Sequence, residues 1–311
     1  MNAVFLASAF VVGGLLAVQA SVNLQLNKAV GTPYGAATLQ LAIAATLLAV
    51  VTAVVGDLGA IAHIATVTPW KLLGGIASPI YITSAILLFP RLGALASVGL
   101  FVTGQVFASL ALDLGGLLGV PRSPLSPGVL LGAAAVPVGI TVVIRSQAIV
   151  TGASALPKRG SRAGWTALGL VAGAVLPVQG AVNALLRTAL RKPLAVGTVS
   201  FLVATLAIAI VLAVLLATGR TPRPQIRPLV TMPWWGWLGG AAAATYVTAT
   251  FLLIPTIGAA TTVALTVTGQ QVASAFADHY GWFRLPRRPF THARLTGLAT
   301  LVAGSALVQF L

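Results

Sequence analysis

Ten apolar stretches, each about as long as the hydrocarbon core of a bilayer is thick, follow one another along this chain. A helix needs about 20 residues to cross ~30 Å of hydrocarbon, and only a helix satisfies its own backbone hydrogen bonds there. The pattern predicts an all-α polytopic membrane protein with ten transmembrane helices. The predicted spans are residues 3–27, 34–55, 70–89, 93–118, 127–147, 163–187, 194–218, 234–254, 258–283 and 292–310.

The composition agrees with a chain whose main solvent is lipid. Hydrophobic residues make up 58% of the chain and charged residues 7%, and the mean hydropathy of +1.01 excludes an ordinary soluble surface. The net charge of +15 comes from 18 basic residues that lie in short connections between apolar stretches. Basic residues in such places set membrane topology, so the expected partner is the bilayer and not a nucleic acid.

The second half of the chain repeats the first. At an offset of 160, residues 13–33 match residues 173–193 at nine of 21 positions; at an offset of 165, residues 90–124 match residues 255–289 at 16 of 35. The matches include rare Gln, Asn, Asp and Pro residues, which low complexity would not align. We therefore predict an internal duplication. Its parts are a first five-helix repeat at 1–147, a connecting loop at 148–162 and a second five-helix repeat at 163–311.

Five is an odd number of spans, so the second repeat begins on the opposite side of the membrane and is inverted. Thirteen Lys and Arg residues fall on the side that the chain reaches after its first span, and five fall on the other side. Because basic residues concentrate in cytoplasmic loops, this count predicts that both termini lie outside the cytoplasm.

Polar residues recur at helical spacing inside the spans. Gln105 and Ser109 stand four residues apart on one face of the fourth span, and Gln270 and Ser274 repeat this on the ninth. Polar side chains are costly in hydrocarbon and usually face the interior of the bundle or a wet cavity. The candidate solute-binding residues are Gln19, Asn23, Tyr81, Gln105, Ser109, Gln179, Asn183, Tyr246, Gln270 and Ser274.

Another role for the same amides is to join helices through hydrogen bonds worth about 1 kcal/mol or less each. Asp113 follows Ser109 by four residues, and Asp278 follows Ser274 by four residues, so each lies on the polar face of its helix. Both are candidate proton-coupling groups, as acids inside membranes often are. Alternatively, each carboxylate pairs with an arginine of the following loop, Arg122 or Arg287. These alternatives stay open at this stage.

No catalytic set is visible in the sequence. The chain contains three Asp, no Glu, three His and no Cys, which leaves no zinc-type spacing and no set of nucleophile, base and orienting group. A phosphate-binding loop of the GxxxxGK[ST] type is also missing. We therefore expect no enzyme activity, no metal and no cofactor, and any energy for transport would come from gradients.

The residues shared by the two repeats resemble those of the YdcZ-like family of bacterial inner-membrane proteins, in the drug/metabolite transporter superfamily. The resemblance is carried by Q-x-x-x-N in the first span of each repeat (Gln19 and Asn23; Gln179 and Asn183), by the proline before the second span, and by T-G-Q-x-x-A-S in the fourth. The resemblance implies a ten-helix antiparallel repeat fold and a location in a bacterial inner (plasma) membrane. The small multidrug resistance exporters, which are distantly similar, use a glutamate of their first helix for proton and cation exchange, and this chain has no Glu.

Together these features predict a secondary transporter for a small polar or amphipathic solute. Inverted repeats favour alternating access around a site at the repeat interface. A single chain with both repeats is expected to work as a monomer. Two alternatives remain: a passive channel, and a membrane scaffold or receptor that transports nothing.

Overall fold

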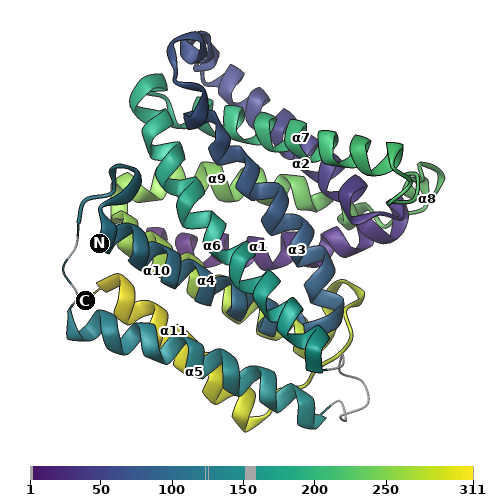
Figure 1. Ribbon diagram of the computed structural model, residues 1–311, viewed down its shortest axis with the longest axis vertical. Helices are drawn as coiled ribbons and strands as arrows, with labels where there is room; N and C mark the ends of the chain where they lie inside the picture. The colour runs from purple at the N-terminus through teal and green to yellow at the C-terminus, as the bar shows by residue number, and fades with distance from the viewer. Residues whose placement is uncertain (1–2, 123, 125, 151–158, 311) are drawn as a thin grey trace.

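The computed structural model describes residues 3–122, 124, 126–150 and 159–310, and throughout these residues the regular structure is helical, without strand (Figure 1). The predicted all-α class is confirmed. The first repeat holds α1 (Ala3–Val30), α2 (Pro33–Val54), α3 (Ala77–Leu92), α4 (Ala94–Gly115) and α5 (Pro127–Val150). The second holds α6 (Arg159–Leu190), α7 (Pro193–Ala217), α9 (Leu238–Ile257), α10 (Ala259–Tyr280) and α11 (His292–Phe310).

Short helical segments fill the connections between the long helices. Turns of 3-10 helix lead directly into α3 and α9, so these two spans begin before their α-helical parts. The segments are η1 (Leu58–Thr66), η2 (Pro69–Ile76), η3 (Leu117–Gly119), α8 (Arg227–Val230), η5 (Trp234–Trp237) and η6 (Trp282–Arg284). Most of the predicted connecting loop, at 151–158, lies outside the described residues.

Nine helices of the described chain are long and apolar enough to cross a membrane. Of the ten predicted spans, the exception is α10, which carries Gln270, Gln271 and Asp278. These three side chains are buried in protein, so α10 can be less apolar than a helix that faces lipid. On the outside, α7 exposes Leu206, Ile210 and a third apolar residue, Val214, at a spacing of four, as expected of a lipid-facing stripe.

The two ends of the bundle are named here for what they contain. The terminal face is the end where α1 begins and α11 ends (Figure 1). The join face is the opposite end, where α5 ends and α6 begins. Each long helix takes the chain from one face to the other, and two contacts agree with this path. Asp57 forms an ion pair with Lys192 on the terminal face, and the hydroxyls of Thr32 and Thr221 are hydrogen-bonded on the join face. The first repeat therefore starts at the terminal face and the second at the join face.

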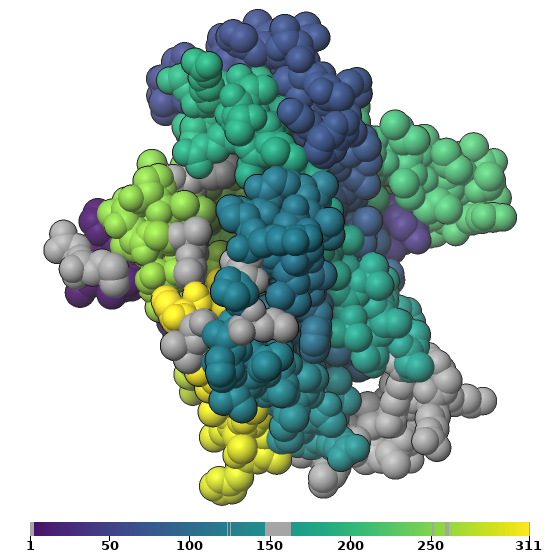
Figure 2. Space-filling view, turned by 60° about the vertical axis from the view of Figure 1, so that its left-hand side comes forward, coloured from purple at the N-terminus to yellow at the C-terminus, as the bar shows by residue number. Residues whose placement is uncertain are grey.

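Helices of one repeat pack against helices of the other with pseudo-twofold symmetry, so that a contact between two helices recurs between their counterparts. Helix α1 packs on α10 and α9, and its counterpart α6 packs on α4 and α3. Helix α2 packs on its own counterpart α7, and α5 on its counterpart α11; both pairs lie side by side in Figure 1. In the space-filling view, segments of both repeats alternate over the surface (Figure 2). The repeats thus interleave and share one core, instead of forming separate domains.

Glycines bring the interleaved helices close together, and their contacts repeat in both halves. A Cβ on Gly13 of α1 would overlap the backbone of Thr266, and one on Gly173 of α6 would overlap the backbone of Phe101. These contacts are equivalent because α1 corresponds to α6 and α10 to α4. Small residues at such crossings allow the close backbone approach on which helix packing in lipid depends.

Pro90 and Pro255, which were predicted to end spans, lie inside α3 and α9. Each helix continues to the residue before a glycine, Gly93 or Gly258, with φ of 86° and 85°. A proline near a helix end removes only one backbone donor, whereas a positive φ redirects the chain and is adopted easily only by glycine. The glycines therefore separate these spans from the next ones.

Candidate functional site

A cavity of about 470 Å³ lies at the interface between the repeats. Helices α1, α3 and α4 of the first repeat and α6, α7, α9, α10 and α11 of the second contribute to its wall. Much of the wall is apolar, with Leu16, Ile82 and Phe201 among its members, and polar groups interrupt it at intervals. Such a wall suits a solute with an apolar body and a few hydrogen-bonding groups.

Most of the predicted solute-binding residues meet in this cavity although they come from six different helices. Those in the wall are Gln19, Tyr81, Gln105, Ser109, Gln179, Asn183, Tyr246 and Gln270. Asn23 and Ser274 lie outside the wall: the Ser274 hydroxyl donates to the Gln270 carbonyl at 2.6 Å, and Asn23 is buried against Gly239. Which wall residues bind a solute stays a prediction.

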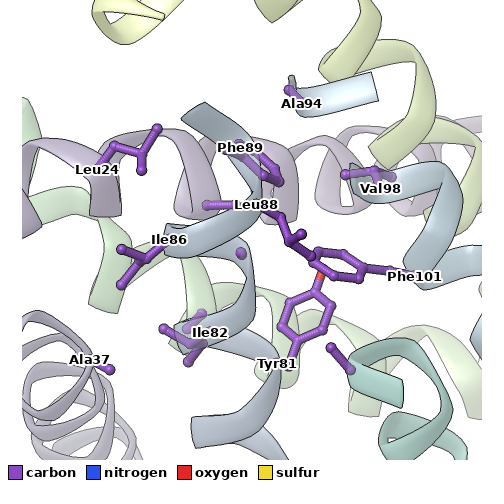
Figure 3. Close-up of a cluster of buried hydrophobic side chains, with 14 of the residues drawn as sticks. Leu24, Ala37, Tyr81, Ile82, Ile86, Leu88, Phe89, Ala94, Val98 and Phe101 are labelled. Carbon is purple, nitrogen blue, oxygen red and sulfur yellow. The ribbon is translucent and has the colours of Figure 1, made fainter. Parts of the chain in front are cut away.

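On one side of the cavity a short hydrogen bond joins the two repeats. Gln270 of α10 donates through Nε2 to the Tyr81 hydroxyl of α3 at 2.6 Å. The Tyr81 ring packs on Phe101 with a centroid distance of 4.8 Å, within the buried apolar cluster of Figure 3. The cluster fixes the ring, so the hydroxyl and amide are held in place before any solute enters.

A second group of polar contacts lies toward the terminal face. Gln179 Nε2 donates to the Ser78 hydroxyl at 2.9 Å, and Asn183 Nδ2 donates to the Ser200 hydroxyl at 3.2 Å. Ser78 and Ser200 also belong to the cavity wall, and both were missed by the sequence analysis. A signal existed for Ser200, because at an offset of 160 it corresponds to Gln40, a rare amide in an apolar span.

Among the described residues, the exposed members of the cavity wall lie toward the terminal face, so the cavity opens on that side. Gly180, Ala184 and Arg187, on the terminal half of α6, are exposed. Their equivalents on α1 lie on the join-face half, where Ala20 is 3% and Leu24 5% exposed. The pseudo-twofold symmetry of the helix contacts is therefore broken in the accessibility of the cavity.

The charge of the wall is positive. Arg187 is its single charged residue among the described part of the chain, and no carboxylate lines it. Within that part, the Arg187 side chain makes no hydrogen bond or ion pair and is exposed near the mouth. Asp113 and Asp278, predicted as proton-coupling groups, are not in the wall.

Asp278 is held at the join face by several groups at once. Its carboxylate accepts from the backbone N–H groups of Ala94 at 2.8 Å and Leu95 at 3.1 Å, at the start of α4. The Arg294 guanidinium of α11 donates to Asp278 Oδ2 at 2.8 Å, with both side chains buried. The predicted alternative of a loop partner, Arg287, is wrong, because Arg294 takes that position from the next helix.

A second arginine, Arg288, lies beside this ion pair. Its backbone N–H donates to the Asp278 carbonyl at 2.7 Å and its side chain donates to the Arg91 carbonyl at 3.4 Å. Burial lowers the pKa of Arg288, since desolvation disfavours the charged guanidinium, and attraction to Asp278 opposes this. Two buried cations therefore surround one carboxylate. The other acid of the repeat pattern, Asp113, is half-buried and makes no hydrogen bond or ion pair within the described residues.

A helical bundle made of two interleaved inverted repeats, with a cavity between them whose wall carries amides and hydroxyls, defines a polytopic membrane transport protein. The comparisons name its family. The family described as "Putative inner membrane exporter, YdcZ" matches residues 4–142 and again residues 164–307. The chain belongs to this family of multi-pass inner-membrane proteins, which is a transport family and not an enzyme family. The predicted family and the predicted two repeats are confirmed.

Other comparisons add the fold alone. No curated protein matches the sequence. A crystal structure that is 18% identical covers 97% of this chain and is itself covered over 96% of its length, with a TM-score of 0.57. At that identity the likeness extends to the arrangement of the helices and not to a solute.

Proposed function

We propose that this protein is a secondary transporter that moves a small polar or amphipathic solute by alternating access at the repeat interface. The observation that carries the proposal is a cavity bounded by both repeats, whose exposed wall residues in the described part of the chain lie toward one face. Inverted repeats make a second state natural, because exchanging the conformations of the two repeats yields the same cavity opened to the other face. The fixed amides and hydroxyls of the wall supply the solute's hydrogen-bonding partners.

We further propose that the solute is uncharged or anionic. Among the described residues, the wall offers neutral amides, two tyrosines and Arg187, and no carboxylate that could balance a buried organic cation. A cation brought into this cavity would lose its hydration and gain no compensating charge. Carboxylate-bearing amphiphiles gain a partner in Arg187 as they enter.

The first test concerns the two equivalent amides of α4 and α10. Replacing Gln105 and Gln270 together by leucine is expected to weaken binding of the best compound from a thermal-shift screen of uncharged and carboxylate-bearing amphiphiles by about tenfold or more. The reason is that the cavity would lose two hydrogen-bonding side chains, one of them the partner of Tyr81. Thermal shift and saturation of flux in proteoliposomes measure this.

A matched control is Gln271→Leu on the same helix. Gln271 is fully buried, lies outside the wall, has no partner for either amide atom, and corresponds to Val106 in the other repeat. Its replacement should leave binding intact. Unchanged binding in the Gln105 and Gln270 variant would refute the site. Flux without saturation would indicate a channel, and solute-insensitive melting without flux would indicate a scaffold.

The second test concerns the charge of the solute. An Arg187→Gln variant is expected to bind carboxylate-bearing compounds about tenfold more weakly and uncharged compounds equally well, since only the former use the guanidinium. Arg191→Gln is the control: Arg191 is exposed on the same face and does not line the cavity. Tighter binding of organic cations than of anions by the unaltered protein would contradict the proposed solute class.

A further inference from the structure

The pseudo-twofold symmetry of the helix contacts fails where α4 and α10 begin. At Gly93, before α4, the space that a Cβ would take is filled by the Arg288 guanidinium and the Asp278 carboxylate. At the equivalent Gly258, before α10, no atom of the described residues lies within 4 Å of that position, although the backbone φ is nearly the same. The equivalent crossings in the middle of the bundle, such as Gly13 with Thr266 and Gly173 with Phe101, are filled in both repeats. This asymmetry lies at the ends of helices that line the cavity.

The filled end closes the join face. Asp278, 1% exposed, joins the end of α10 to the first N–H groups of α4, and Arg294 joins the same carboxylate to α11. A carboxylate at a helix N-terminus is favoured by the unpaired N–H groups and by the helix dipole. Three helices are thus tied together at one point, on the face where the cavity is shut.

Within the described residues, the equivalent point on the terminal face lacks the contacts that Asp278 makes at the start of α4. Asp113 stands at the end of α4 as Asp278 stands at the end of α10, and the start of α10 is its symmetric target. Within the described residues Asp113 makes no hydrogen bond, and Gly258 has no neighbour in the position that Asp278 takes beside Gly93. This is the face to which the cavity opens.

Two buried amides on the closed side correspond to polar residues that line the cavity on the open side. Within the described residues, Asn23 Oδ1 and Gln40 Oε1 are buried without a hydrogen-bond partner, and such burial is costly. Their equivalents, Asn183 and Ser200, line the open half of the cavity. Water or solute would reach Asn23 and Gln40 if the join face opened in the same way.

We propose that Asp278 and Asp113 are alternating latches: Asp278 closes the join face by capping α4, as observed, and Asp113 closes the terminal face by capping α10 in the opposite state. The proposal rests on the proposed function, because it assigns the two states of alternating access to two carboxylates. Arg294 strengthens only the Asp278 latch, since its equivalent position is Val129. The observed state is accordingly the more stable one at rest.

The experiment uses the absence of cysteine in the natural chain, so spin labels go only where cysteines are introduced. One labelled pair, Arg91→Cys with Tyr280→Cys, reports on the join face, and a second pair, Leu114→Cys with Thr256→Cys, reports on the terminal face. Pulsed electron–electron double resonance gives the distribution of distances between the two spin labels of each pair in proteoliposomes. No solute is needed, because exchange between states occurs without one.

Two substitutions have opposite expected results. Asp278→Asn should lengthen the join-face distances and shorten the terminal-face distances, because the observed latch is weakened and Asp113 takes over. Asp113→Asn breaks no contact of the observed structure, so it should fold normally and leave a single open terminal-face distance, with solute flux reduced about tenfold or more. Asp57→Asn is the control, since Asp57 pairs with Lys192 away from the four labelled helix ends, and should change neither distribution.

The outcomes separate the latch from the transporter. If both faces exchange between open and closed in the unaltered protein and in both Asp variants alike, the latch is overturned while alternating access stands. If the unaltered protein and Asp278→Asn both show the join face permanently closed, alternating access itself fails. Shifts in the two expected directions support the latch.

Discussion

A Gly173→Val variant is expected to fail to assemble into a monodisperse, heat-resistant protein. A Cβ at Gly173 would overlap the backbone of Phe101 on α4, including its Cα and carbonyl carbon at 2.7 Å and 2.6 Å. Backbone atoms in the middle of a helix cannot turn aside as the tip of a side chain can. Overpacking of this kind costs about 3 kcal/mol or more, at the upper end of its usual range. Fluorescence-detected size-exclusion chromatography and thermal melting in detergent measure the loss.

The control for this variant lies on the same helix. Gly164 has nothing within 4 Å of the position of an added Cβ, so Gly164→Val should melt close to the unaltered protein. The pseudo-twofold symmetry also predicts that Gly13→Val is as damaging as Gly173→Val, because Gly13 meets the backbone of Thr266 in the equivalent crossing. A stable Gly173→Val protein would contradict the close contact of α4 and α6.

The second large effect is expected from Arg294→Met. This change leaves the Asp278 carboxylate buried without its ion-pair partner, and breaking a buried pair from one side typically costs about 3–5 kcal/mol. The lost donations from the Arg294 side chain to the carbonyls of Arg288 and Pro289 add to the cost. We expect a clear fall in melting temperature, measured on purified protein at neutral pH.

Two further variants isolate the ion pair. Arg287→Met removes an exposed arginine of the same loop that makes no ion pair, and should be nearly neutral. Adding Asp278→Asn to Arg294→Met should recover part of the lost stability, because the unpaired charge is gone. If Arg294→Met and Arg287→Met melted alike, the pair would contribute nothing to stability.

The fold was predictable because its signals lie in the order of residues along the chain. The apolar stretches located the ten long helices within a few residues, and the offsets of 160 and 165 paired their equivalents. The same offsets paired Gln19 with Gln179 and Gln105 with Gln270. All four line one cavity, because equivalent positions on equivalent helices face the interface that the repeats share.

Errors arose where a contact depended on the path of the chain between helices. One of the two alternatives for Asp278 paired it with Arg287, which is near in sequence and recurs as Arg122. Helix α11 instead brings Arg294 to the carboxylate, at a position that the repeat does not share. Asn23 matched Asn183 in sequence, yet only Asn183 reaches the cavity, since the two halves of the bundle are in different conformations.

From the sequence alone followed a ten-helix bundle of two inverted repeats, because hydropathy and self-similarity are properties of the chain before it folds. Only the tertiary structure decided that the terminal face is open, that the join face is closed, and that Asp278 rather than Asp113 is engaged. The physical reason is that the two repeats are nearly equal in sequence, so the sequence pattern is compatible with either repeat taking the closed arrangement. The choice between them depends on contacts across space, such as Arg294 with Asp278, that equal sequences do not distinguish.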